Sequence, residues 1–112
     1  MQPEGISDVN NVVRHAFLWA RGTMSDLGTL DGANSYASGI NARGQVVGDS
    51  DTASSGRHAF VWENGTLTDL GTLGGSNSFA LAINANGTIV GLSSNATGEF
   101  YATLWKKIVS YP

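Results

Sequence analysis

The stretch RHAFVW, Arg57–Trp62, repeats the stretch RHAFLW, Arg14–Trp19, 43 positions earlier in the chain. Without a gap, residues 14–48 agree with residues 57–91 at 22 of 35 positions. Three tryptophans keep the same spacing, namely Trp19, Trp62 and Trp105. A fixed period of this length is typical of the blades of a β-propeller. A helical repeat of similar length needs long amphipathic stretches, which the sequence lacks.

Each period divides into four short strand-like segments separated by turn signals. In the second copy the segments are Ser35–Asn41, Gln45–Ser50, Arg57–Trp62 and Thr66–Leu70. Gly44 and Gly87 stand where a type I turn is followed by a left-handed residue. Asn64 and Gly65 stand at the centre of a two-residue hairpin, where both residues need a positive φ. The sequence therefore predicts four-stranded antiparallel meanders.

The repeated stretch is apolar on both of its faces. If it is a strand, one face carries His58, Phe60 and Trp62, and the other carries Arg57, Ala59 and Val61. A strand that is apolar on both sides is covered on both sides, as in blades that stack face to face. We therefore expect an all-β, propeller-like array of about two and a half blades with a 43-residue repeat. The expected units are a partial blade at 5–30, a blade at 31–73 and a blade at 74–112 with a divergent last strand.

Composition excludes several classes of partner. Only 13% of the residues are charged and the net charge is −3, whereas nucleic acids and anionic membranes attract clustered Lys and Arg. No cysteine is present, so the chain has neither disulfides nor thiolate metal sites. No apolar run approaches the length of a membrane span. The first eleven residues have neither a basic nor an apolar region, so we expect no signal peptide in this chain.

Several motif words together resemble the HAF-repeat family of bacterial extracellular proteins. These motifs are HAFLW at His15–Trp19, GTMSDLGTL at Gly22–Leu30, SxAxxIN at Ser35–Asn41 and GQVVG at Gly44–Gly48. The resemblance covers roughly Gly5 to Trp105, and it implies a secreted or surface-attached bacterial protein with propeller-like repeats. It implies no established enzymatic activity and no known catalytic residues. The third copy departs from the family pattern, because it reads Tyr-Ala-Thr in place of His-Ala-Phe and ends in KKIVSYP.

The residues of the repeated words are expected to form the core of the blades. They are His15, Phe17, Trp19, His58, Phe60, Trp62 and Trp105. The two histidines could instead be metal ligands or catalytic bases, but Tyr101 replaces them in the third copy, which favours histidines that bond a turn. The tryptophans could instead stack on sugars, although a central strand favours core packing. Asp26 and Asp69 are expected to cap turns beside a glycine.

Two segments are predicted to be ligand-presenting loops that tolerate substitution, Gly48–Gly56 and Gly91–Gly98. Asp49 and Asp51 lie in the first, and Asn95 lies in the second. Calcium would need several more oxygen ligands than the two carboxylates, and the second segment has neither Asp. We therefore expect no metal site and no cofactor.

Three classes of function remain open, namely an interaction scaffold, a carbohydrate-binding module and an enzyme. Catalysis needs an acid, base or nucleophile that breaks the repeat symmetry, and few residues do so. We therefore favour a non-enzymatic structural scaffold, with the carbohydrate-binding module as the alternative, and we predict no catalytic residues. The ligand is expected to be a protein or a glycan. Open blade edges and bare apolar faces at the ends predict a homo-oligomer, with a twofold dimer favoured.

Overall fold

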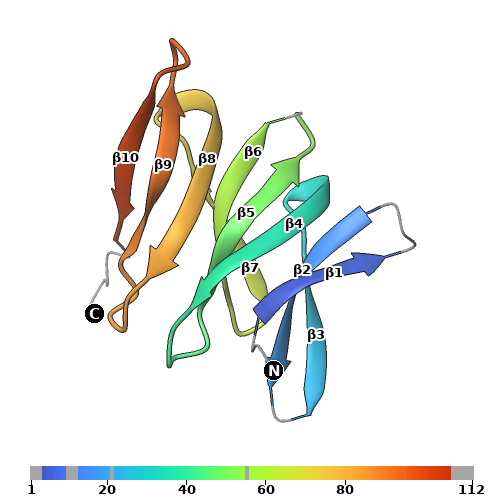
Figure 1. Ribbon diagram of the computed structural model, residues 1–112. Coiled ribbons are helices and arrows are strands. Elements are labelled where there is room, and N and C mark those ends of the chain that lie inside the picture. The colour runs from blue at the N-terminus through green and yellow to red at the C-terminus, as the bar shows by residue number, and fades with distance from the viewer. Residues whose placement is uncertain (1–3, 10–12, 21, 55, 107–112) are drawn as a thin grey trace, which may run out of the picture.

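The computed structural model describes residues 4–9, 13–20, 22–54 and 56–106, and within these ranges the chain is all-β (Figure 1). Its strands are β1 (Glu4–Val9), β2 (Val13–Ala20), β3 (Thr23–Gly28), β4 (Asp31–Ile40), β5 (Val46–Thr52), β6 (Arg57–Glu63), β7 (Thr66–Gly71), β8 (Gly74–Ile83), β9 (Ile89–Asn95) and β10 (Phe100–Trp105). Among the described residues no helix has the length and apolar character to cross a membrane.

The strands form three antiparallel sheets in which neighbours in sequence are neighbours in space. The first sheet has the order β1-β2-β3, the second β4-β5-β6-β7, and the third β8-β9-β10. The second sheet is the four-stranded meander that the sequence predicts. None of the three sheets closes into a barrel within the described ranges. Figure 1 shows them side by side, with β8–β10 at one end of the molecule.

The first sheet has three strands, whereas a half blade would have two. The strand β1 pairs with β2 in antiparallel register, from Glu4 opposite Leu18 to Val9 opposite Val13. In the second sheet β5 pairs with β6 in the same way. The N-terminal segment therefore takes the place of a second strand, and the edge of β2 that a half blade would leave open is covered.

Other strand boundaries also differ from the sequence prediction. The strands β4 and β8 begin at Asp31 and Gly74, earlier than Ser35 and Ser78, because Asp31 pairs with Thr52 across a bulged register. The predicted divergent last strand falls in residues 107–112, which lie outside the described residues. In the second sheet the turn residues follow the prediction, since φ is 79° at Gly44, 51° at Asn64 and 85° at Gly65.

Two apolar clusters join the three sheets face to face. The first lies between the first and second sheets and contains the buried residues Ala16, Leu27, Val46 and Phe60. The second lies between the second and third sheets and contains the buried residues Val47, Ala59, Ala80 and Ile89. Adjacent residues of β5, Val46 and Val47, therefore serve opposite clusters, because successive side chains of a strand point to opposite faces. This arrangement explains why the repeated stretch is apolar on both sides.

Buried serines connect consecutive sheets through hydrogen bonds. The Ser35 hydroxyl of β4 accepts a 2.8 Å bond from the backbone N–H of Ala16 and donates a 2.6 Å bond to the carbonyl of Gly28. Both partners lie beside the bulge between β2 and β3, where the ladder is interrupted. Ser78 makes the equivalent bonds to Ala59 and Gly71, at 2.8 and 2.7 Å. Each serine thus satisfies backbone groups that the bulge of the preceding sheet leaves unpaired.

Candidate functional site

The residues predicted to form the repeat core lie at several depths. Phe60 is fully buried in the first cluster, and Trp62 packs against that cluster as a partly buried residue. Trp105 packs in the same way against the second cluster. Phe17 and Trp19 lie in β2, but their side chains are outside the described part of the structure. Where they are described, the tryptophans are half-buried residues at the rims of the clusters.

Each described histidine bonds a turn-capping aspartate. His58 Nδ1 lies 2.8 Å from Asp69 Oδ2, and Asp69 Oδ1 accepts a 2.7 Å bond from the N–H of Gly71. His15 makes the same contact to Asp26 at 2.8 Å, and the N–H of Gly28 bonds that carboxylate. The predicted turn-capping role of both aspartates is confirmed. Because the two histidine–aspartate contacts are alike, neither breaks the symmetry of the repeat.

The prediction that Asp49 and Asp51 lie in a loop is wrong. Both lie in strand β5, and the connection to β6 begins only after Thr52. At Gly48, in the same predicted loop, a Cβ atom would collide with the carbonyl oxygen of Tyr36. This strand is longer than the sequence suggests because its polar residues pair with β4 and β6. The expectation that Gly48 tolerates substitution is therefore wrong as well.

The two aspartates hold the guanidinium of Arg57. Arg57 Nη1 donates a 2.6 Å bond to Asp49 Oδ2, and Nη2 donates a 3.0 Å bond to Asp51 Oδ1. The guanidinium carbon also lies 4.5 Å from the centroid of the Tyr36 ring, within range of a cation–π contact. An arginine thus occupies the position that a bound cation would take between these carboxylates.

Burial dominates the electrostatics of this group. The Asp49 side chain is 13% exposed, and burial raises the pKa of its carboxyl above the ordinary value, against the lowering effect of the Arg57 hydrogen bond and charge. Burial acts to lower the pKa of the Arg57 guanidinium, but its hydrogen bonds to Asp49 and Tyr36 raise it overall. The ion pair is therefore a partly dehydrated structural contact between β5 and β6 of the second sheet.

Asn95 is the last residue of β9 rather than the middle of a loop. Its side-chain Oδ1 accepts hydrogen bonds from the backbone N–H groups of Thr97 and Glu99, both at 3.0 Å. In the same predicted loop, a Cβ atom at Gly91 would collide with the carbonyl oxygen of Phe79. The role of Asn95 is to close the turn between β9 and β10, and the connection itself is formed by residues 96–99.

The third sheet exposes an apolar face. We call this the open face, and its residues are Phe79, Val90, Leu92, Phe100 and Leu104. Cross-strand pairing places them on one side, because Phe79 is opposite Leu92 and Leu104 is opposite Val90. Four of the five are between 39% and 54% exposed. The rings of Phe79 and Phe100 stack with their centroids 6.1 Å apart.

In the second sheet the residues that correspond to the open face are partly or fully buried. We call this the covered face, and its residues are Tyr36, Val47, Asp49, Arg57 and Val61, each 43 positions before its counterpart. Val47 is fully buried against Ala80 and Ile89 of the third sheet. The open face of the third sheet thus corresponds to the covered face of the second sheet, but no further described sheet lies over the open face.

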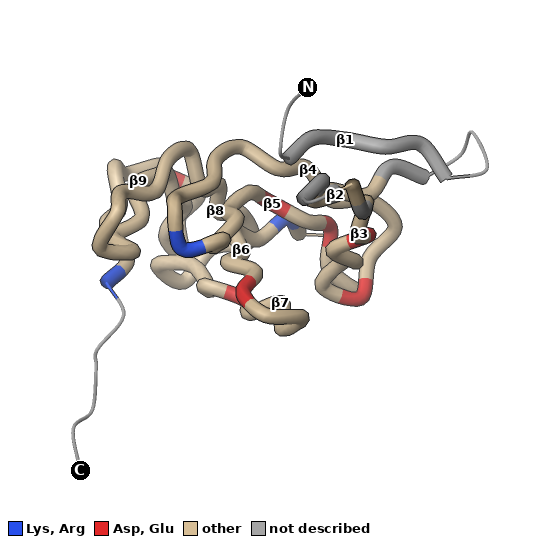
Figure 2. Tube along the Cα trace, turned by 90° about the horizontal axis from the view of Figure 1, so that it is seen from below, with Lys and Arg blue, Asp and Glu red and all other residues tan. Residues whose placement is uncertain are grey.

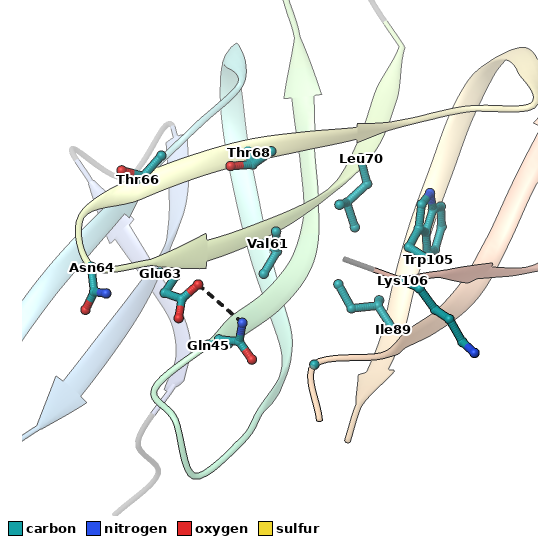
Figure 3. Close-up of a pocket in the computed structure, with 11 residues that line it drawn as sticks. Gln45, Val61, Glu63, Asn64, Thr66, Thr68, Leu70, Ile89, Trp105 and Lys106 are labelled. Carbon is teal, nitrogen blue, oxygen red and sulfur yellow. Dashed lines mark hydrogen bonds between the residues drawn. The ribbon is translucent and has the colours of Figure 1, made fainter. Parts of the chain in front are cut away.

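A pocket of about 510 Å³ opens between the outer strands of the second and third sheets (Figure 3). Its apolar wall consists of Val61, Leu70, Ile89 and Trp105. Its rim is polar and includes Gln45, Glu63, Asn64, Thr66, Thr68 and Lys106. Gln45 Nε2 donates a 3.3 Å bond to Glu63 Oε1 across one end. The pocket combines an apolar wall with a rim of neutral polar groups, one glutamate and one lysine.

Charges are sparse around these surfaces. Figure 2 shows the Lys, Arg, Asp and Glu positions spread along the chain trace. In the described part of the chain, no group of three or more His, Asp or Glu side chains is placed to hold a metal ion. Searches of protein-family models, curated proteins and solved structures gave no match to the chain. Its function must therefore be argued from its own surfaces.

Proposed function

We propose that the chain is a non-enzymatic scaffold module, a propeller-like stack of blades that repeats every 43 residues and amounts to about two and a half blades. Two contacts that recur every 43 residues support this reading. One is the hydrogen bond of a buried serine, Ser35 or Ser78, to the preceding sheet, and the other is the histidine–aspartate contact within a sheet. The HAF-repeat resemblance adds an extracellular or cell-surface location to the proposal. The shared geometry of the two histidine–aspartate contacts argues against a specialised catalytic base.

The open face of the third sheet is the proposed interaction surface. An exposed apolar patch of this kind marks an interaction site in a folded protein. In the chain itself the covered face packs against a neighbouring sheet, on the side that contains Ala80 and Ile89, so a face at this position can be covered by another sheet. We therefore propose that the open face binds the open face of a second copy, which makes a twofold dimer.

Sedimentation equilibrium at micromolar concentration tests this proposal. The wild-type chain should be a dimer, and Leu92→Glu should be a folded monomer, because the glutamate would be buried without a partner at the dimer axis. Met24→Glu is the matched control, since Met24 is exposed on β3 of the first sheet. This control should remain a dimer. A folded wild-type monomer contradicts the proposal, and dissociation of both variants would indicate head-to-tail stacking instead.

Carbohydrate binding is the second candidate function. One observation favours it, namely that Trp105 lines the pocket together with polar rim groups. Aromatic rings with nearby polar groups suit a sugar, which has both apolar and hydroxyl surfaces. A glycan array with Trp105→Leu as the control separates this function from the scaffold function, because only sugar binding requires the indole ring.

A further inference from the structure

The tripeptide Asn-Gly-Thr occurs twice in the chain, at Asn64–Thr66 and at Asn86–Thr88. An asparagine that precedes glycine is prone to lose its side-chain amide, because glycine has no Cβ atom to shield the backbone nitrogen that attacks the amide carbon. In an unfolded chain the two tripeptides should therefore react alike. The folded chain places them in turns of different kinds.

The first tripeptide leaves the attacking nitrogen free. Asn64 and Gly65 are the exposed residues of the turn between β6 and β7, with φ values of 51° and 85°. Within the described part of the chain, the N–H of Gly65 donates no hydrogen bond. No atom beyond its chain neighbours lies within 4 Å of the place that a Cβ would take at Gly65. Figure 3 shows the Asn64 side chain at this turn, at one end of the pocket.

The second tripeptide holds the equivalent nitrogen in a closed turn. The N–H of Gly87 donates a 3.0 Å hydrogen bond to the carbonyl of Asn84. The Asn84 side chain accepts two further 3.0 Å bonds, from the N–H groups of Asn86 and Thr88. Gly87 is buried, and Gln45 Oε1 lies 3.2 Å from the place that its Cβ would take. Attack by this nitrogen therefore requires local opening of the turn.

We propose that Asn64 is a site of spontaneous deamidation in the folded protein and that Asn86 is protected from the same reaction. The reagent is water. The backbone nitrogen of Gly65 loses its proton to hydroxide and attacks Cγ of Asn64, so that a nitrogen–Cγ bond forms and the Cγ–Nδ2 bond breaks. Nδ2 takes a proton from water and leaves as ammonia, and a cyclic imide remains. Water then opens the imide at either carbonyl, which gives aspartate or isoaspartate.

Deamidation at Asn64 changes the rim of the pocket. Asn64 lines the pocket together with Glu63, so either product adds a second carboxylate beside that residue at neutral pH. Isoaspartate also adds a methylene to the backbone of a two-residue turn that depends on positive φ at both residues. The tip of the hairpin should therefore rearrange. This inference depends only on the two turns, so it stands apart from the proposed dimer and from sugar binding.

Peptide mapping by mass spectrometry after incubation in mildly alkaline buffer tests the proposal. Water enriched in heavy oxygen labels the product, because the oxygen that replaces the amide nitrogen comes from water. In the folded chain, deamidation at Asn64 should be at least about tenfold faster than at Asn86, where a hydrogen bond must break and a buried turn must open. In urea that unfolds the chain, the two rates should become similar, because the tripeptides are identical.

Two variants connect the difference in rate to the turns. Asn84→Ala removes the side chain that holds the second turn, and it should accelerate deamidation at Asn86 several-fold without a change at Asn64. Asn95→Ala is the matched control, because it removes a similar pair of hydrogen bonds from the turn between β9 and β10. It should leave both rates unchanged. Equal rates at Asn64 and Asn86 in the folded wild type, or no reaction at Asn64 while the unfolded chain reacts, overturns the proposal.

Discussion

The covered face of the second sheet and the open face of the third sheet have the same backbone and different chemistry. At corresponding positions the covered face has Tyr36, Asp49 and Arg57, and the open face has Phe79, Leu92 and Phe100. The covered face contains a bidentate ion pair with a cation–π contact. The open face contains a stacked aromatic pair. The more polar of the two faces is thus the one under cover.

This inversion shows that burial and polarity are set separately in a repeat. The covered face can contain charges because both aspartates hold one arginine and Val47 keeps the apolar contact with the third sheet. The open face is apolar without cover, which favours association with another surface. Between residues 74 and 105 the third sheet carries a single charged side chain, Glu99, so little opposes that association.

The same substitution at corresponding valines should give the largest difference. Val47→Asp places an unpaired carboxylate in the second cluster, where Val47 is fully buried, and should cost about 3–5 kcal/mol of unfolding free energy. Val90→Asp lies on the open face and should change stability by less than about 0.5 kcal/mol. Urea denaturation at low protein concentration checks both values without a contribution from dimerisation. Similar losses at both positions would contradict the distinction between the faces.

Removal of the arginine should give the next largest effect. Arg57→Ala leaves the Asp49 carboxylate partly buried without its donor and should cost about 1–3 kcal/mol. A fourfold variant, Tyr36→Phe, Asp49→Leu, Asp51→Ser and Arg57→Phe, copies the open face onto the covered face. It should recover most of that loss, because apolar residues often replace a buried ion pair without cost. Thermal melting compares the three proteins, and no recovery would show that the ion pair is required.

The pH dependence of stability should identify Asp49. Burial raises the pKa of this carboxyl in the folded state above its ordinary value of 3.8, so the folded state binds the proton more tightly than the unfolded chain. The resulting stability is fully present below the ordinary pKa and is lost as pH rises through the raised pKa. Between about pH 3 and about pH 7, the wild type should lose stability relative to Asp49→Asn. A constant difference between the two proteins over this range would refute the assignment.

Truncation of the exposed ring should give the smallest effect. Phe100→Ala removes the stacking on Phe79 but leaves no buried cavity, since Phe100 is about half exposed. The loss should be about 1 kcal/mol or less. Phe100→Leu, which retains part of the apolar contact, should lose less still. A loss comparable to that of Arg57→Ala would mean that the open face is more tightly packed than its exposure indicates.

Several features of the fold could be predicted from the sequence because they depend on local chemistry. The positive φ values at Gly44, Asn64 and Gly65 follow from residue type, and the alternation in Arg57–Trp62 indicates a strand covered on both sides. The length of β5 could not be predicted in this way. Its polar residues Asp49 and Asp51 favour a loop when the sequence is taken alone, because their pairing with Arg57 is visible only in the structure.

The candidate site was less accessible to sequence reasoning than the fold. The repeated pairs Asn34-Ser35 and Asn77-Ser78 were a sequence signal for the buried serines that connect the sheets. They do not identify the backbone groups at the bulge to which each serine bonds. The pocket also had no signal of its own, because its lining comes from β6, β7, β9 and β10 and from the turns before β5 and β9. Residues from separate repeats come together there only when the sheets stack.

The sequence by itself determined the repeat, the antiparallel strands and the two-sided apolar pattern of the central strand. These depend on spacing and on the period of two of a β-strand, which can be read along the chain. Only the tertiary structure decided which of two equivalent faces is covered and which is open. That outcome depends on which faces of a sheet have a neighbouring sheet. Among the described sheets, the second has a neighbour on both faces, whereas the first and the third each have one neighbour. Corresponding residues of the repeat therefore differ in exposure, as Val47 is fully buried and Val90 is 44% exposed.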